Sequence, residues 1–269
     1  MRITFIGGGI MAEAIINGVL ENNLATPVDI VVVELLETRR AHLTQRYGVE
    51  SVVDGQSITS GTGDIVVLAV KPQDLPKAMA SIKGTLTSTQ VVLSIVAGVR
   101  ITTIISGLAH EAVVRVMPNT PAQIGAAASV WTATPEVSIE RLNDVCNLLQ
   151  AIGEEVQVAG EHYVDMATGL SGSGPAYVFM FIESLTDAGV HVGLTRDMSA
   201  KLAVQTVLGS AQLVRQSGLH PAELRNMVTS PGGTTAEGTL VLEGAGFRTS
   251  IIEAVAAAYE KALLLGEEE

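Results

Sequence analysis

The sequence predicts a doubly wound α/β domain over residues 1–160, followed by an all-helical domain over residues 161–269. Short apolar runs alternate with helical patterns in the first part, which is typical of a mostly parallel sheet with right-handed crossovers. Beyond residue 161 the strand patterns stop and helical periodicity continues almost without a break. A chain of 269 residues is long enough for two domains that each have a core.

The first elements are an apolar strand at residues 3–6, a glycine turn at 7–12 and an amphipathic helix. This order is the dinucleotide-binding (Rossmann) fingerprint. Gly7 makes the turn, Gly9 leaves room for the pyrophosphate, and Ala12 stands at a position where Ala is allowed. The helix start stabilises the phosphate charge. The predicted pyrophosphate contacts are Gly7, Gly8, Gly9, Ile10, Met11 and Ala12.

Cofactor contacts are also expected where later strands end. Further strands are predicted at 29–34, 64–70, 91–97, 113–117, 126–131 and 156–159. Glu34 ends the next apolar run, where an acid can accept hydrogen bonds from the adenosine ribose. Val70, Lys71 and Pro72 follow one strand and are expected to contact the cofactor through their backbone.

Asn119 and Thr120 follow another predicted strand, and we expect them at the nicotinamide side of the cofactor. The alternative for this pair is a loop with an Asx-type turn. For Lys71 the alternative is a solvated charge at the end of a strand.

The second part of the chain is predicted to be helical at 179–190, 198–214, 221–228 and 251–265. Two glycine- and proline-rich breaks, 171–175 and 230–235, place hydroxyl groups just before a helix. Ser173 in the first break is either a helix cap or a substrate contact. The second break offers consecutive N–H groups that suit a small carboxylate.

Composition excludes several classes of function. A formal net charge of −12 without a basic stripe argues against nucleic acid and anionic membranes as partners. One cysteine and five scattered histidines give no metal-ligand spacing, so no metal is expected. The chain opens on strand-like sequence without a signal-like segment, which suggests a cytoplasmic location. A hydrophobic content of 47% and mean hydropathy of +0.39 favour a large subunit interface.

Together these motifs resemble the pyrroline-5-carboxylate reductase family over essentially the whole chain. The most specific blocks are RVMPNTPA at 115–122, GLSGSGPAYVF at 169–179 and SPGGTT at 230–235. The resemblance implies reduction of 1-pyrroline-5-carboxylate to L-proline with NADPH or NADH. It also implies a homodimer interlocked through the helical domain, with possible rings of dimers.

The resemblance also assigns the substrate site. The implied substrate-binding residues are Ser230, Gly232, Gly233, Thr234, Thr235 and Ser173, and Thr235 is the implied catalytic residue nearest the ring nitrogen. The β-hydroxyacid dehydrogenases share this architecture but place a catalytic lysine and an asparagine where this chain has Val178 and Ile182. A protonated cyclic imine is already an electrophile, so its reduction does not require that lysine.

The sequence departs from the family pattern after the second strand. Glu34-Leu35-Leu36 replaces a small polar residue followed by a basic one. An acid there repels the 2′-phosphate of NADPH, which favours NADH, although Arg39 or Arg40 could compensate by folding back. Two other functions stay open: a related imine or carbonyl reductase acting on another small acid, and a non-catalytic nucleotide sensor.

Overall fold

The computed structural model describes residues 1–54 and 64–267 of the chain. It divides into two compact units. Unit 1 consists of Met1–Ser173 and Ala257–Glu269, and unit 2 of Gly174–Ala256. The division therefore lies later than the expected domain boundary at residues 160 and 161, because α6 (Glu161–Ala167) packs on strands β6 and β7 of unit 1.

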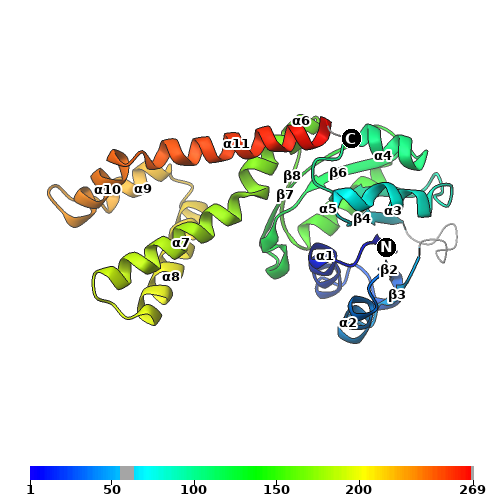
Figure 1. Ribbon diagram of the computed structural model, residues 1–269, viewed down its shortest axis with the longest axis horizontal. Helices are drawn as coiled ribbons and strands as arrows, with labels where there is room; N and C mark the ends of the chain where they lie inside the picture. Colours follow the sequence, from blue (N-terminus) through cyan, green and yellow to red (C-terminus); the bar gives the residue numbers. More distant parts are fainter. Residues whose placement is uncertain (55–63, 268–269) are drawn as a thin grey trace. The chain divides into compact units, whose positions relative to one another are not determined.

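Unit 1 is built on an eight-stranded sheet with the order β3-β2-β1-β4-β5-β6-β7-β8 (Figure 1). Neighbouring strands are parallel except for β6 and β7, which are antiparallel. The strands are β1 (Ile3–Ile6), β2 (Ile30–Val33), β3 (Glu50–Val52), β4 (Ile65–Leu68), β5 (Val91–Ser94), β6 (Val113–Met117), β7 (Ala127–Ala133) and β8 (Gly153–Gln157). The doubly wound sheet confirms the predicted fold class.

Two strands differ most from the sequence prediction. β3 was not expected, because it is short and begins at the exposed Glu50. β8 starts earlier than the expected run 156–159, because Gly153 pairs closely with β7. A Cβ atom on Gly153 would stand 2.3 Å from the backbone oxygen of Ala127, so only glycine fits there.

Helices cover both faces of the sheet (Figure 1). Apolar residues of α1 (Ile10–Glu21), α2 (Glu37–Tyr47) and α5 (Ile139–Gln150) belong to one buried cluster with the strands. Residues of α3 (Leu75–Ile82) and α4 (Ile101–Leu108) belong to a second cluster. The central strands β1, β4 and β5 contribute to both clusters, as expected for strands that are buried on both faces.

A buried charge network ties α6 to the sheet. Arg115 on β6 is 1% exposed and donates to Asp165 Oδ1 on α6 at 2.5 Å. It also donates to a carboxylate oxygen of Glu161 at 3.0 Å. The second oxygen of Asp165 lies 3.3 Å from the guanidinium of Arg100. Each buried charge therefore has an opposite charge beside it, which offsets the cost of its desolvation.

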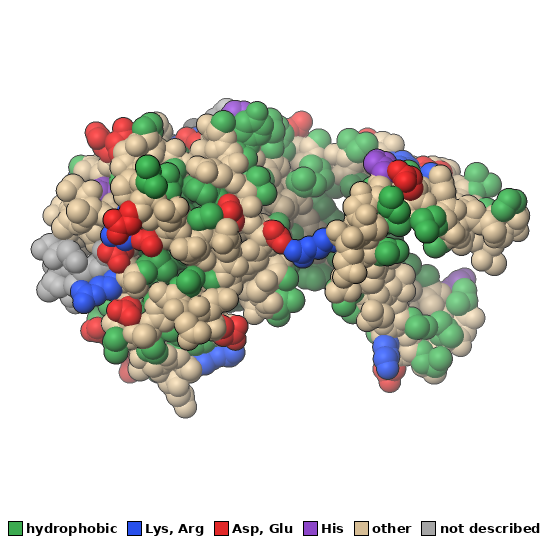
Figure 2. Space-filling view, turned by 180° about the vertical axis from the view of Figure 1, so that it is seen from behind, with side chains coloured by type: hydrophobic (Ala, Val, Ile, Leu, Met, Phe, Trp, Pro, Cys, Tyr) green, Lys and Arg blue, Asp and Glu red, His purple; other side chains and the backbone are tan. Residues whose placement is uncertain are grey.

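Unit 2 is helical. Its elements are α7 (Gly174–His191), α8 (Arg196–Ser217), α9 (Pro221–Met227), α10 (Thr234–Gly244) and the first part of α11 (Phe247–Glu267). Helices α7 and α8 pack as a pair (Figure 1). Large apolar side chains are exposed at many positions of unit 2. Several apolar patches of this unit are visible on the face shown in Figure 2.

None of the helices in residues 1–54 and 64–267 combines the length and the hydrophobicity needed to cross a membrane.

Candidate functional site

The glycine turn lies at the carboxyl edge of the sheet, between β1 and α1. Gly7 has φ +100°, and a Cβ atom there would stand 2.7 Å from the carbonyl oxygen of Ala69. Its N–H donates to the carbonyl oxygen of Val33 at 2.8 Å, which ties the turn to the end of β2. Glycine is therefore required at this position both by conformation and by space.

The start of α1 fits a dinucleotide pyrophosphate. A Cβ atom on Gly9 would meet no atom within 4 Å, so open space lies beside the turn. Gly9 is the N-cap and provides no side-chain cap, which leaves N–H groups of the first helical turn for an anion. Ala12 is fully buried, whereas Ile10 is exposed and Met11 is partly buried. Ala12 thus lies against the sheet, as the fingerprint requires.

Glu34 lies directly against the glycine turn. One carboxylate oxygen accepts a hydrogen bond from the N–H of Gly8 at 2.9 Å, and the other from the N–H of Leu36 at 2.8 Å. These bonds hold a negative charge at the end of β2, where the ribose of a dinucleotide is expected.

Two arginines at the start of α2 are also fixed at this edge. Arg39 donates to the carbonyl oxygens of Gly8 and Gly9 and forms an ion pair with Glu13 of α1. Arg40 donates to the carbonyl oxygens of Glu34 and Leu35 at 2.8 and 2.7 Å. Both arginine side chains therefore fold back onto backbone carbonyl oxygens at this edge of the sheet.

Glu13 is a residue that the sequence analysis missed. Burial alone would raise the pKa of Glu13, but hydrogen bonds from His42, Arg39 and Tyr47 outweigh burial and lower this pKa from 4.5 to about 2. The carboxylate is therefore ionised at neutral pH. Its position in the first turn of α1 was visible in the sequence, but its partners on α2 were not.

The ends of β4 and β6 complete this edge of unit 1. After β4, Val70 and Pro72 are partly buried and Lys71 is exposed. After β6, the side chain of Asn119 donates to the carbonyl oxygen of Ser171 at 3.0 Å and accepts from the N–H of Ala128 at 2.9 Å. Asn119 therefore holds this loop together, and the adjacent Thr120 is exposed.

Ser173 ends unit 1, directly after a π-helical turn at Thr168–Gly172. Its N–H donates to the carbonyl oxygen of Thr168 at 2.8 Å, and its side chain is partly buried. The backbone of Ser173 therefore closes this turn just before α7 begins.

The expected substrate loop lies at the start of α10 in unit 2. Gly232 has φ +66°, and the N–H of Gly233 donates to the carbonyl oxygen of Ser230 at 3.0 Å. A Cβ atom on Gly233 would stand 2.3 Å from the hydroxyl of Ser230. Gly233 is the N-cap of α10 and gives it no side-chain cap, so the N–H groups that follow are suited to a carboxylate. Thr235, in the first turn, is partly buried and Thr234 is exposed.

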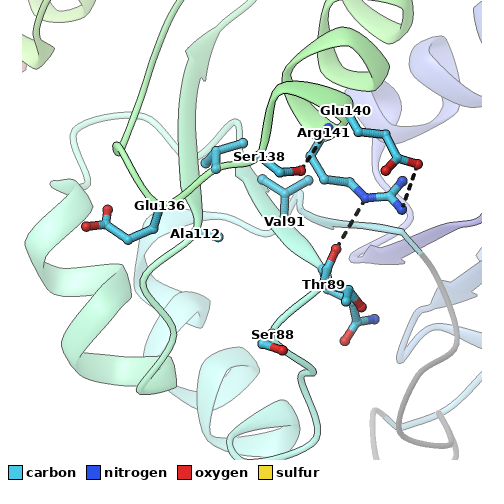
Figure 3. Close-up of a pocket in the computed structure, with 10 residues that line it drawn as sticks. Ser88, Thr89, Val91, Ala112, Glu136, Ser138, Glu140 and Arg141 are labelled. Atoms are coloured by element: carbon cyan, nitrogen blue, oxygen red, sulfur yellow. Dashed lines mark hydrogen bonds and ion pairs between the residues drawn. The ribbon is translucent and has the colours of Figure 1, made fainter.

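A cavity of about 310 Å³ lies at the other edge of the sheet. It borders the starts of β5 and β6 and the start of α5 (Figure 3). In its wall Arg141 donates to the carbonyl oxygen of Thr89 at 3.2 Å and lies 3.6 Å from a carboxylate oxygen of Glu140. Ligands of open parallel sheets bind beyond the carboxyl ends of strands, so this cavity is separate from the predicted cofactor site. Among the described residues no group of three His, Cys, Asp or Glu side chains is arranged to hold a metal ion.

Known protein families match both the first part and the helical part of the chain. The family model for pyrroline-5-carboxylate reductase dimerisation matches residues 161–265, and a model described as NADP oxidoreductase coenzyme F420-dependent matches residues 2–98. Pyrroline-5-carboxylate reductase of Synechocystis sp. is 43% identical over 267 residues, which cover 99% of each chain.

The chain belongs to the pyrroline-5-carboxylate reductase family.

Solved members of this family have the same fold. A pyrroline-5-carboxylate reductase from Coxiella burnetii is 35% identical and has a TM-score of 0.90, covering 98% of both chains. Pyrroline carboxylate reductase from Plasmodium falciparum, solved with NADP bound, is 30% identical with a TM-score of 0.89 and covers 99% of this chain and 98% of its own. The predicted family and fold class are confirmed, and the chain is an oxidoreductase that uses a nicotinamide cofactor.

Proposed function

We propose that the chain reduces 1-pyrroline-5-carboxylate to L-proline with a reduced nicotinamide dinucleotide. The observation that carries this proposal is the uncapped start of α10, where Gly233 leaves N–H groups for a small carboxylate and Thr235 supplies a hydroxyl in the same turn. Full-length similarity to reductases of this name supports it.

The proposal assigns the cofactor to unit 1. The glycine turn 7–12 and the start of α1 hold the pyrophosphate, Glu34 contacts the ribose, and the loops after β4 and β6 bound the nicotinamide side. When bound, the cofactor supplies a hydride to the imine carbon of the substrate. Because Asn119 already bonds Ser171 and Ala128, its role is to shape that loop.

The proposal assigns the substrate carboxylate to the loop 230–235 of unit 2, and it keeps Ser173 as a further substrate-binding residue. The start of α10 binds and orients the carboxylate, and the Thr235 hydroxyl accepts a hydrogen bond from the ring N–H. The ring nitrogen keeps its proton while the imine carbon gains the hydride. No side-chain acid is needed at Val178, where related dehydrogenases of ketone substrates have lysine.

For the cofactor we propose NADH over NADPH, because the carboxylate of Glu34 is fixed by two backbone N–H groups at the end of β2. For assembly we propose a homodimer through the helical residues 161–265, which match the dimerisation model. Rings of such dimers are a further part of the proposal.

The test is proline formation from 1-pyrroline-5-carboxylate with each reduced nucleotide, measured beside 1-pyrroline, which lacks the carboxylate. We expect proline with both nucleotides, faster with NADH, and a loss in kcat/KM of at least about 100-fold for 1-pyrroline, since a carboxylate contact contributes roughly 3 kcal/mol. Absence of proline with either nucleotide contradicts the proposal. Equal turnover of 1-pyrroline indicates another imine reductase, and nucleotide binding without turnover indicates a sensor.

A further inference from the structure

The guanidinium of Arg39 touches both the glycine turn and α1. It donates to the carbonyl oxygens of Gly8 and Gly9, the latter at 3.2 Å, and pairs with a carboxylate oxygen of Glu13. The Arg39 side chain is 22% exposed and that of Glu13 18%, so the pair is partly shielded from water. A shielded pair of this kind is screened less by salt than one on the open surface.

Glu13 is held by further partners on α2. His42 Nε2 and the Tyr47 hydroxyl each lie 3.0 Å from its other carboxylate oxygen, and Arg46 lies 3.9 Å from that oxygen. These partners hold the carboxylate of Glu13 against α2, and the carboxylate in turn holds the guanidinium of Arg39.

Gly8 connects this pair to the ribose region. Its N–H donates to Glu34, and its carbonyl oxygen accepts from Arg39. A negative and a positive side chain thus contact one peptide segment of the turn. A 2′-phosphate next to Glu34 would be close to Arg39 as well, and the charge of that arginine would partly offset the repulsion from Glu34.

Glu13 prevents Arg39 from offsetting the repulsion between Glu34 and a 2′-phosphate. It neutralises the guanidinium of Arg39 and fixes it on the carbonyl oxygens of the turn. NADPH carries about two more negative charges than NADH at the ribose, so a neutralised arginine weakens NADPH binding more than NADH binding.

We propose that Glu13 is a specificity-determining positioning residue of the cofactor site: by pairing with Arg39 it lowers affinity for the 2′-phosphate of NADPH relative to NADH. The inference rests on the proposed function only in that unit 1 binds these nucleotides. It holds whichever of the two binds more tightly, because it concerns the change in their ratio.

The main test is calorimetric binding of NADPH and NADH to Glu13→Gln, which keeps the side-chain shape and removes the charge. We expect the affinity ratio of NADPH to NADH to rise about fivefold. The affinity for adenosine 2′,5′-bisphosphate should rise by a similar factor, whereas the affinity for 5′-AMP should change less than twofold. Glu21→Gln, which makes the same charge change at the other end of α1, is the matched control and should leave the ratio unchanged.

The route through Arg39 is tested by the double variant Glu13→Gln/Arg39→Gln. We expect the rise in the affinity ratio of NADPH to NADH to disappear in this double variant. If the gain persists, the charge of Glu13 acts directly on the phosphate and the positioning role is overturned. Glu13→Asp keeps the charge but shortens the reach to Arg39, so it should raise the ratio in the same direction, which covers the case of a Glu13→Gln protein that does not fold.

The failures are distinguishable. A wild-type chain that binds neither nucleotide overturns both this inference and the proposed function. A wild-type chain that binds both, with an unchanged ratio in Glu13→Gln and Glu13→Asp, overturns this inference alone.

Discussion

Units 1 and 2 differ most in where their apolar side chains lie. Unit 1 contains two buried clusters, one against each face of its sheet. Within residues 174–256, all of which the structure describes, the buried residues are Thr186, Ser199 and Ala203. Large apolar side chains of the same unit are exposed, among them Phe179, Met180, Leu240 and Val241.

The difference shows that unit 1 has a core within one chain, whereas unit 2 buries little by itself. Exposed apolar surface of this extent is typical of an interface that forms together with the fold. The match of residues 161–265 to a dimerisation model supports the same reading. Stability of unit 2 is therefore expected to depend on protein concentration, unlike that of a closed core.

The largest effect on assembly is expected for Phe179→Glu. Phe179 is 60% exposed on α7, and in the proposed homodimer a charge at this position would raise the dissociation constant at least about 100-fold, or roughly 3 kcal/mol. Sedimentation velocity over a range of concentrations measures it. Val28→Glu is the control, since Val28 is 88% exposed in unit 1 and should leave the assembly intact. Unchanged assembly of Phe179→Glu would contradict a subunit interface over α7.

The largest effect on folding stability is expected in the core of unit 1. Arg115→Ala leaves the carboxylate of Asp165, which is 2% exposed, without its closest partner and should lower the free energy of unfolding by about 4 kcal/mol. Urea unfolding followed by the fluorescence of the buried Trp131 reports on this unit. Arg196→Ala removes an exposed ion pair with Asp187 in unit 2 and should cost less than about 1 kcal/mol. Equal losses in the two variants would contradict the contrast between buried and exposed pairs.

A smaller effect is expected on kcat/KM when Thr235 of unit 2 is changed. Thr235→Ala should lower kcat/KM roughly thirtyfold, a loss of about 2 kcal/mol in transition-state stabilisation, because in the proposed mechanism the ring N–H loses its acceptor. Thr235→Ser keeps the hydroxyl and should retain most of the activity. Steady-state kinetics of both variants decide the role, and unchanged kinetics in Thr235→Ala would reject it.

The smallest effect concerns nucleotide choice, which is the contribution of unit 1. Glu34→Ser should raise the ratio of kcat/KM for NADPH over NADH about tenfold, since the negative charge beside the 2′-phosphate is removed. Glu50→Ser removes an exposed acid from β3 and serves as the control. A ratio that stays constant would mean that Glu34 only holds the N–H groups of Gly8 and Leu36 in place.

The fold of unit 1 was predictable because its signals are local. Most of its strands are marked by an apolar run of strand length. Gly7 has a positive φ that glycine adopts readily, and Ala12 is small enough to be buried against the sheet. All of these signals lie within a few neighbouring residues of the chain. The same holds for the turn before α10, where Gly232 and Gly233 mark the helix start. The short strand β3 and the charged first half of β8 carry no comparable pattern, so β3 was missed and β8 was predicted only at its end.

The charge pairs were decided by tertiary structure. Arg39 and Glu13 are 26 residues apart in the chain, and Arg115 and Asp165 are 50 apart. Nothing in their spacing indicates contact, because it depends on how α2 packs beside α1 and α6 beside β6. The residue types at the cofactor loop were readable from the sequence, but whether Arg39 compensates Glu34 or is neutralised by Glu13 depends on distances that only packing sets.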